Sequence, residues 1–254
     1  AISAIDRLHV RWFDYVLKGI DTGLLDEPPI HFFEMGTNDW RTFSQLPEPS
    51  PIYTVITHGL ASIDPTDGEL TLDATGDRST LPDTFVHDPW RPVPTVGGHA
   101  TFPAGSGDRT SVDCRTDVVT YTTPPLDTDL HLAGEIRAEI QCGADAPSFD
   151  LCAVLSEVDQ NGRVMSFSQG YQRTDGAMPG QPHTVAIALQ PTCICIPAGH
   201  ALRLSLSAAC FPSYSVNPGT GTHPHNSQLI DARIVTLTIH SDGDRASQIW
   251  LPVC

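Results

Sequence analysis

The sequence predicts an all-β fold, an antiparallel jelly-roll sandwich preceded by one α-helix. Three observations lead to this prediction. Pro (22 residues) and Gly (20) are abundant in a chain of 254, and frequent turn residues favour many short strands over long helices. An apolar period near 3.6 occurs only at the start of the chain, and after Pro29 the period is two. Around ten short strands without intervening helices are typical of two packed sheets, and their number fits a jelly roll.

The helix is predicted over residues 2–20. Apolar side chains recur there at steps of three and four residues, and Asp14 and Lys18 have the i,i+4 spacing of an ion pair. Gly19 is a plausible helix stop, and Pro28 and Pro29 forbid continuation. Because a short amphipathic helix needs a partner surface, its aromatic face is predicted to dock against another domain. The aromatic side chains of this face are Trp12, Phe13 and Tyr15.

The strands are predicted from alternating apolar and polar residues. Residues 159–162 join two such runs and predict a hairpin. Residues 81–113 are rich in Pro and Gly and have little periodicity, which predicts a long ordered loop of the kind that often carries function. The predicted strands are 30–35, 52–57, 69–72, 118–122, 130–141, 149–158, 164–169, 183–189, 201–208 and 233–240.

The charge of the chain argues against two classes of partner. Lys and Arg number 14 against 30 Asp and Glu, so the net charge is −16 with His neutral, and such a chain repels nucleic-acid phosphates. Lys18 is the only lysine, and the arginines form no basic stripe that would bind a membrane surface. No apolar run approaches the roughly 20 residues that span a bilayer. We therefore expect no nucleic-acid partner and no membrane partner.

Seven cysteines at irregular spacings predict free, buried thiols in a reducing, cytoplasmic compartment. An odd number in a chain of this length does not suit a secreted disulfide framework. A disulfide between Cys142 and Cys152 across a hairpin is the alternative. Cys193 and Cys195 point to one face of an extended segment, but the C-x-x-C pairs of a structural zinc site are missing from the sequence.

No sequence motif predicts a catalytic, metal or cofactor site. The sequence contains no G-x-S-x-G, Walker A, G-x-G-x-x-G or H-E-x-x-H motif. His223 and His225 could both bind a metal from one loop, but no third ligand follows at a typical spacing. Residues 64–68 lack the further alternating oxygens and final Glu of a calcium loop, so a β-turn is favoured. We expect no catalytic residue, no metal and no cofactor in this chain.

Several longer motifs match one known family, in the same order along the chain. They are residues 11–21, 28–41, 88–98, 117–126, 132–134, 145–150, 158–163, 197–204, 211–221 and 249–253. Together they resemble the C-terminal part of the CocE/NonD-type serine hydrolases, a group that includes the Xaa-Pro dipeptidyl-peptidases and the α-amino-acid ester hydrolases. Cys193 and Cys195 depart from the pattern, because the family has ordinary apolar or small residues there.

The resemblance implies how the chain divides into domains. Residues 1–27 would be the last helix and linker of an otherwise absent α/β-hydrolase domain, and residues 28–254 a jelly-roll domain of the galactose-binding-like type. In this family the catalytic Ser, Asp and His precede the helix, and the Gly-Pro-Trp-type motif before the His is absent here. His9 is therefore not carried over as catalytic. The chain begins at Ala1 rather than Met, which fits the end of a longer hydrolase.

The resemblance also implies where the active-site cleft of the parent enzyme lies. In the family the cleft forms where the jelly roll meets the hydrolase domain, and an apolar wall residue follows a Gly-Gly pair. Gly97 and Gly98 match that pair and Phe102 matches the wall residue. The alternative is that Phe102 anchors the loop in the jelly-roll core. The residues expected at the interdomain contact are Trp12, Phe13 and Trp90.

Three functions are consistent with the sequence. The first is a non-catalytic domain of a serine hydrolase that cleaves ester or amide bonds, with the absent hydrolase domain as partner and a homo-oligomer as a further expectation. The second is a free-standing jelly roll that binds carbohydrate or peptide. The third is one half of a split enzyme. The first predicts an exposed apolar patch around Trp12, Phe13 and residues 81–113, whereas the second predicts a groove lined by Trp or Tyr away from the helix.

Overall fold

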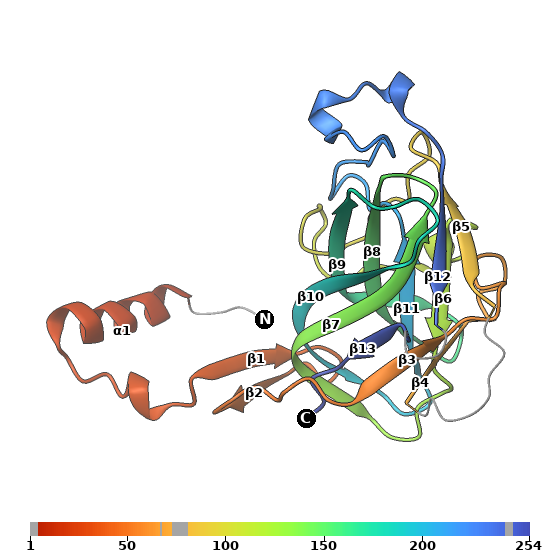
Figure 1. Ribbon diagram of the computed structural model, residues 1–254. Coiled ribbons are helices and arrows are strands. Elements are labelled where there is room, and N and C mark those ends of the chain that lie inside the picture. The colour runs from red at the N-terminus through yellow and green to blue at the C-terminus, as the bar shows by residue number, and fades with distance from the viewer. Residues whose placement is uncertain (1–4, 67, 73–80, 242–245) are drawn as a thin grey trace.

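The computed structural model describes residues 5–66, 68–72, 81–241 and 246–254, and they form a β-rich body with an arm on one side (Figure 1). The arm consists of α1 (Ile5–Lys18), a short 3₁₀ helix η1 (Leu24–Asp26) and the hairpin of β1 (Ile30–Glu34) and β2 (Asp39–Phe43). In the described residues, no helix is both long enough and apolar enough to cross a membrane.

Helix α1 lies within the predicted range 2–20, whose first three residues fall outside the described part of the chain. Gly19, at φ 66°, ends the helix, and its N–H donates to the carbonyl of Tyr15 at 3.1 Å. The expected ion pair between Lys18 and Asp14 is present at 2.6 Å. None of the 14 residues of α1 is buried. A helix of this length is marginal by itself in water, so α1 needs a further surface to pack against.

The other described strands, all in the body, form one closed, barrel-like sheet. Its order is β10-β9-β8-β11-β6-β4-β3-β13-β7-β12-β5, and β7 also pairs with β10, which closes the ring. The strands are β3 (Ile52–Ile56), β4 (Glu69–Thr71), β5 (Asp83–His87), β6 (Val118–Thr122), β7 (Leu130–Ala144), β8 (Ser148–Val158), β9 (Val164–Asp175), β10 (His183–Ile196), β11 (Ala201–Ser207), β12 (Val235–His240) and β13 (Gln248–Trp250). Three short helices are α2 (Thr110–Asp113), η2 (Pro224–Asn226) and η3 (Leu229–Asp231).

This sheet confirms a mostly antiparallel all-β fold with one main helix, but it differs from the predicted pair of separate sheets. β9 and β10 pair at the single position Gly170–Leu189. β4 and β6 pair at the single position Glu69–Thr122, in parallel orientation. These two single-residue pairings connect the two faces of the body through backbone hydrogen bonds. The sheet is therefore continuous around the body.

All ten predicted strands are present, and β2, β5 and β13 were missed. In β5 the side chains of Asp83, Phe85 and His87 point inward and are buried. Because two of these three inward residues are polar, the sequence of β5 does not show the alternation of apolar and polar residues that predicts a strand. β9 and β10 are longer than predicted. β10 continues past a register shift between Leu189 and Thr192, which interrupts its alternating pattern.

The hydrophobic core lies inside the closed sheet and includes a satisfied buried acid. Asp83 is fully buried, and its carboxylate accepts hydrogen bonds from the hydroxyl of Tyr121 at 3.0 Å and from the backbone N–H groups of Gly59 and Ala61. These bonds compensate for the lost hydration of the carboxylate. The largest fully buried side chains include Tyr121, Phe85, Phe149, Leu70, Leu132 and Ile136.

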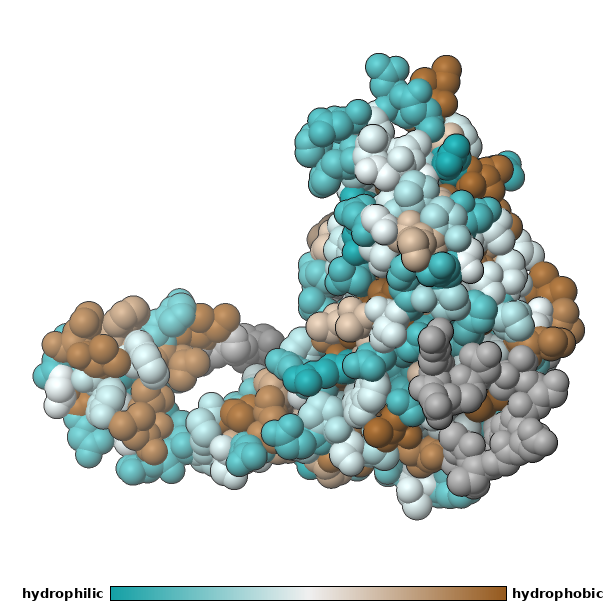
Figure 2. Space-filling view, viewed as in Figure 1, coloured by the Kyte–Doolittle hydropathy of each residue, from teal (hydrophilic) through white to brown (hydrophobic). Residues whose placement is uncertain are grey.

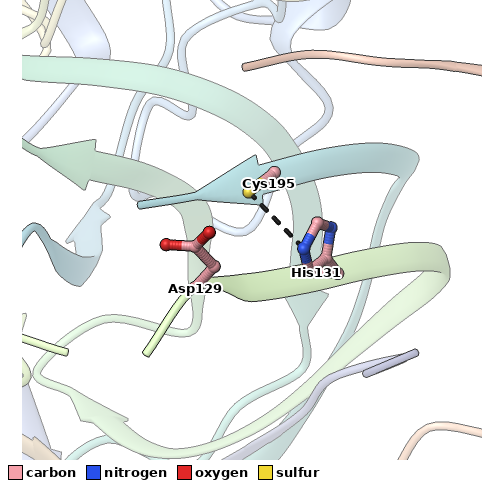
Figure 3. A group of neighbouring side chains, drawn as sticks. All are labelled: Asp129, His131 and Cys195. Carbon is pink, nitrogen blue, oxygen red and sulfur yellow. Dashed lines mark hydrogen bonds between the residues drawn. The ribbon is translucent and has the colours of Figure 1, made fainter. Parts of the chain in front are cut away.

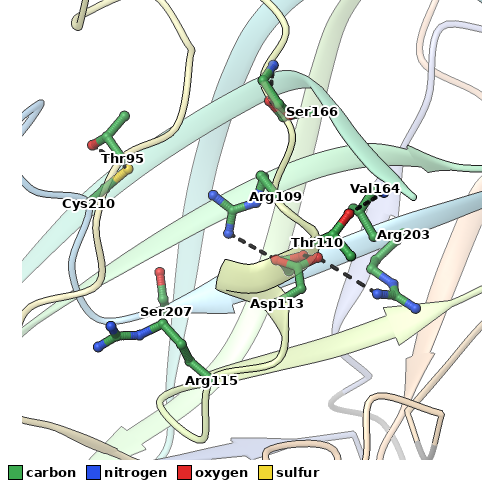
Figure 4. Close-up of polar contacts among 12 residues, drawn as sticks. Thr95, Arg109, Thr110, Asp113, Arg115, Val164, Ser166, Arg203, Ser207 and Cys210 are labelled. Carbon is green, nitrogen blue, oxygen red and sulfur yellow. Dashed lines mark hydrogen bonds and ion pairs between the residues drawn. The ribbon is translucent and has the colours of Figure 1, made fainter. Parts of the chain in front are cut away.

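The segment predicted as a long loop, residues 81–113, contains β5 and α2, and its last residue, the buried Asp113, holds it to the body (Figure 4). Arg109 Nη2 lies 3.1 Å from Asp113 Oδ1, and both side chains are almost fully buried. Arg203 on β11 approaches the second oxygen of Asp113 at 3.8 Å, and the hydroxyl of Ser205 donates to it at 2.9 Å. The buried carboxylate thus holds the end of the segment against β11.

Candidate functional site

A small loop, residues 98–105, presents the aromatic side chain that the sequence singled out. The N–H of Gly98 donates to the carbonyl of Gly105 at 2.7 Å, and the reverse bond is 2.8 Å. Gly97 and Gly98 have φ of 65° and 82°, and a Cβ on Gly98 would lie 2.5 Å from the side chain of Gln169. Phe102, in the middle of this loop, is 99% exposed. The alternative that Phe102 anchors the loop in the core is therefore wrong for this chain.

The residues that follow the Phe102 loop (98–105) are tied to the edge of β9. The backbone of Ser166 donates to the carbonyl of Gly107 at 2.9 Å, and its hydroxyl accepts from the N–H of Gly107 at 3.1 Å. The N–H of Val164 donates to the hydroxyl of Thr110 at 3.0 Å (Figure 4). These bonds fix the base of the loop, so an exposed aromatic side chain is held on a rigid support.

A cavity of about 280 Å³ lies beneath the Phe102 loop. It is formed by the loop, by β9 and by the irregular part of β10, together with one residue after β1. The lining is mixed, with backbone, amide and hydroxyl groups beside apolar side chains, and it includes no Trp or Tyr. The residues that line it include Met35, His99, Ser166, Phe167, Gln169 and Pro191.

Behind the loop, a series of polar and aromatic contacts runs from His99 into the body. The amide nitrogen of Gln169 lies 3.3 Å from His99 Nδ1, and the hydroxyl of Tyr214 lies 3.5 Å from Nε2. Tyr214 stacks on Tyr171 with ring centroids 4.1 Å apart, and Tyr171 donates to Asp150 at 2.6 Å. Burial and then the charge of Asp150 raise the pKa of Tyr171, so its hydroxyl stays protonated and serves as a hydrogen-bond donor.

The predicted interdomain residues lie on two parts of the fold. Trp12 and Phe13 are on α1, each about half exposed, whereas Trp90 lies on the body in the segment after β5, with 48% of its surface exposed. Figure 2 shows apolar side chains along α1 at the end of the arm. The structure therefore exposes all three residues but does not gather them into one patch.

A large apolar groove separates α1 from the hairpin of β1 and β2. Its volume is about 970 Å³. Arg11 holds α1 to the linker after it, with Nε donating to the carbonyl of Thr22 at 3.0 Å and Nη1 lying 2.7 Å from Glu27 Oε1. The groove is lined mainly by apolar and aromatic side chains, among them Ile5, Leu8, Trp12, Leu25, Pro29 and Trp40.

The cysteines are free, as expected, and five of the seven are buried. The alternative of a disulfide between Cys142 and Cys152 is wrong, because β7 and β8 do not pair with each other in the sheet. Cys152 instead packs with Cys210 and Val154 in a small buried cluster. His223 and His225 are exposed, with ring centroids 4.2 Å apart, in the segment around η2.

The sequence analysis did not identify a group of potential metal ligands at the base of the arm. Asp129, His131 and Cys195 each place one ligand atom within 4.8 Å of the others (Figure 3). The ring of His131 also contacts Glu34, with 2.9 Å between Nδ1 and Oε1. Burial acts to raise the pKa of Glu34, but hydrogen bonds from His131 and Arg41 outweigh it and lower the pKa to about 2. The spacing Asp129-x-His131, followed by Cys193-x-Cys195, is the only sequence signal for this group.

Over residues 22–250, the chain matches the X-Pro dipeptidyl-peptidase C-terminal non-catalytic domain. The chain belongs to this family. The resemblance noted in the sequence is thus confirmed. This non-catalytic domain is 28% identical over 267 residues to the cocaine esterase of Rhodococcus sp. (strain MB1 Bresler), a match that covers 99% of the chain and 46% of the esterase. The chain therefore spans less than half the length of this curated relative.

Solved structures share the fold of the non-catalytic domain. An aminopeptidase from a marine sediment archaeon, Thaumarchaeota archaeon, matches with a TM-score of 0.81 and 20% identity, over 98% of this chain and 44% of the aminopeptidase. An α-amino acid ester hydrolase matches with a TM-score of 0.78 and 22% identity, over 96% of this chain and 44% of the hydrolase. At these identities the likeness concerns the fold.

Proposed function

We propose that this non-catalytic domain packs against an α/β-hydrolase domain of a serine hydrolase that cleaves ester or amide bonds. The observation that carries the proposal is α1, none of whose residues is buried although seven of its large apolar side chains are exposed. Soluble proteins rarely leave such a contiguous apolar surface without a partner. The exposed apolar residues of α1 are Ile5, Leu8, Val10, Trp12, Phe13, Val16 and Leu17.

The proposal includes a division of the chain. Residues 1–27 are the closing helix and linker of the hydrolase domain, and residues 28–254 are a jelly roll of the galactose-binding-like type. The cocaine esterase supports a further domain, because this chain covers only 46% of it. The domain would act in the cytoplasm, a setting that suits seven free cysteines, and a homo-oligomer is a further part of the proposal.

Phe102 is proposed as a wall residue of the active-site cleft, and Gly97 and Gly98 as the turn that positions it. Two observations support this role. The side chain of Phe102 is exposed on a loop whose base is fixed to β9, so it is available to a second surface in a defined position. A mixed polar and apolar cavity lies directly beneath the loop, where it could extend a cleft between the two domains.

The alternative of a free-standing binding module has less support. A groove for carbohydrate or peptide would be lined by Trp or Tyr and would lie away from the helix. The large groove of the described residues is lined by Trp12 and Trp40, which both belong to the arm. The cavity beneath the Phe102 loop is lined by neither residue type.

The coding DNA upstream of Ala1 gives the first test. We expect an in-frame G-x-S-x-G motif, followed by an acid and a histidine. Purified residues 1–254 should hydrolyse p-nitrophenyl esters no faster than buffer does. Saturable turnover by this chain alone, or a gene that holds no hydrolase domain, would contradict the proposal.

The contact itself is tested in the full-length enzyme. Trp12→Asp should lower the melting temperature and the esterase activity together, because a charge on α1 opposes its burial. Ile230→Asp is the matched control, since Ile230 is 83% exposed on η3, away from the arm, and should leave both unchanged. Equal behaviour of the two variants would show that α1 does not pack against the hydrolase domain.

A further inference from the structure

We propose that Asp129, His131 and Cys195 form a binding site for a zinc ion at the base of the arm. The Sγ atom of Cys195 lies 3.8 Å from Nε2 of His131, and the carboxylate of Asp129 completes a group within 4.8 Å (Figure 3). A tetrahedral zinc ion, with bonds of about 2.3 Å to sulfur and 2.0–2.1 Å to nitrogen, holds these two atoms about 3.6 Å apart. The sulfur and the nitrogen are therefore close to the spacing that the ion requires.

The backbone places the cysteine and the histidine side by side. Cys195 on β10 is directly opposite His131 on β7. The N–H of Cys195 donates to the carbonyl of Met35, at the end of the arm, and the carbonyl of Cys193 accepts from the N–H of Met35, both at 2.9 Å. Because the backbone of Cys195 bonds toward the arm, its pairing with His131 is of the non-hydrogen-bonded kind, in which side chains approach most closely.

A buried carboxylate orients the histidine. Glu34 is 2% exposed, and its Oε1 lies 2.9 Å from His131 Nδ1. Arg41 and Thr37 hold Glu34 in place at 2.6 Å and 2.8 Å. The tautomer that donates Nδ1–H to Glu34 has its lone pair on Nε2, the nitrogen that faces Cys195. A carboxylate that accepts from the second nitrogen is the usual support of a zinc-binding histidine.

Asp129 is held from the other side by the turn after β10. The N–H of Ala198 donates to Asp129 Oδ1 at 2.8 Å, which fixes the carboxylate and leaves its second oxygen available. Asp129 is exposed, His131 is partly buried and Cys195 is buried. The site therefore opens to solvent on the Asp129 side, where an ion can enter and a water molecule can complete the coordination.

The chemistry of the three groups selects the ion. A thiolate and an imidazole suit zinc, whereas calcium and magnesium prefer oxygen ligands alone. One thiolate and one carboxylate balance the two positive charges of the ion. Binding displaces the proton of the Cys195 thiol to solvent. The ion would join β7 to β10 and, through Glu34, stabilise the attachment of the arm.

The test uses residues 1–254, first stripped of metal with a chelator. Cobalt is added as a spectroscopic probe, and zinc affinity is measured by competition with a chromogenic chelator. We expect one cobalt ion per chain, with a sulfur-to-cobalt charge-transfer band that Cys195→Ser abolishes. Glu34→Gln, which replaces the carboxylate beside Nδ1 of His131 but none of the three ligands, should weaken zinc binding by roughly 10- to 100-fold.

Two matched variants control for side effects. Cys193→Ser removes a buried thiol on the same face of β10 and should retain the band. Asp129→Asn keeps an oxygen for the Ala198 N–H on an exposed residue, so it should weaken zinc binding without unfolding the chain. Unchanged affinity in both Cys195→Ser and Asp129→Asn would overturn the proposal. So would a single bound ion that is lost only when His223 and His225 are both replaced by Ala.

Discussion

The guanidinium of Arg173 meets the carboxylate of Asp150 at two points, with Nε 2.7 Å from Oδ1 and Nη2 2.8 Å from Oδ2. Asp150 is 2% exposed. Tyr171 and Asn217 donate hydrogen bonds to the same carboxylate, so its charge is compensated from β9 and from the segment after β11. This carboxylate therefore joins parts of the chain that are distant in sequence.

Arg173→Met should destabilise the domain strongly. It leaves the Asp150 carboxylate buried without its counter-charge, which costs roughly 3–5 kcal/mol in comparable cases. Arg137→Met is the control, because Arg137 and Glu135 form an exposed contact at 3.7 Å and should contribute less than about 1 kcal/mol. The free energy of unfolding in urea measures both. Similar losses in the two variants would show that the buried ion pair contributes no more to the free energy of unfolding than the exposed pair does.

Gly98→Ala should disrupt the base of the Phe102 loop. Gly98 and Gly105 both have positive φ, 82° and 98°, but only a Cβ at Gly98 would meet another group, the Gln169 side chain at 2.5 Å. Gly105→Ala therefore measures the backbone strain alone. We expect Gly98→Ala to lose up to about 1 kcal/mol more stability than Gly105→Ala, the lower end of the cost of overpacking, because the new Cβ meets the flexible end of the Gln169 side chain. Equal losses in urea unfolding would mean that Gln169 moves aside freely.

Phe102→Ala should leave the stability of residues 1–254 within about 0.5 kcal/mol of the parent chain, because the side chain touches little of the body. Phe85→Ala is the comparison, since Phe85 is 2% exposed in the core and should cost roughly 3–5 kcal/mol. If Phe102 forms the wall of the cleft as proposed, Phe102→Ala in the proposed full-length hydrolase should instead change kcat/KM between ester substrates. A change in thermal stability alone would assign Phe102 to packing.

His87 should make the domain less stable in mild acid. Burial lowers the pKa of His87 below its ordinary value of 6.5, although its hydrogen bond to the carbonyl of Asn217 and the charges of Asp150, Asp117 and Asp88 oppose the shift. Between the folded and unfolded pKa values, the unfolded chain binds more protons. This contribution to stability is therefore complete above pH 6.5 and is lost as the pH falls below it.

Urea unfolding at about pH 7.5 and pH 5.5 measures this effect. His87→Gln should reduce the difference between the two pH values, because the glutamine amide can still donate to Asn217 but does not titrate. The control is His225→Gln, since His225 is exposed near η2 and should leave the difference unchanged. An unchanged pH dependence in His87→Gln would assign the acid sensitivity to other groups.

Local patterns were sufficient to predict much of the fold. α1 and the long strands have regular periods, and the bounds of β6, Val118–Thr122, were predicted to the residue. The sequence pattern did not predict β5, because two of its inward side chains are the polar residues Asp83 and His87. Their hydrogen bonds are made with residues that are distant in sequence. The closure of the sheet was also not predictable, since it depends on two single-residue pairings.

For the candidate sites, the resemblance singled out positions but not how they are exposed. It named Gly97, Gly98 and Phe102, and both glycines adopt positive φ, but the exposure of Phe102 depends on how the following residues are bonded to β9. His131 and Cys195 are 64 positions apart. Their contact requires the register of β7 and β10, and the irregular stretch before Thr192 hides that Cys195 belongs to the same strand as Leu189.

Met35 connects the arm to the cavity beneath the Phe102 loop. Its backbone bonds to Cys193 and Cys195 at the base of the arm, and the same residue lines the cavity. Any displacement of the base of the arm would move Met35 and with it one wall of the cavity. The proposed hydrolase domain, by holding α1, would therefore help to set the shape of the cavity that the cleft extends into.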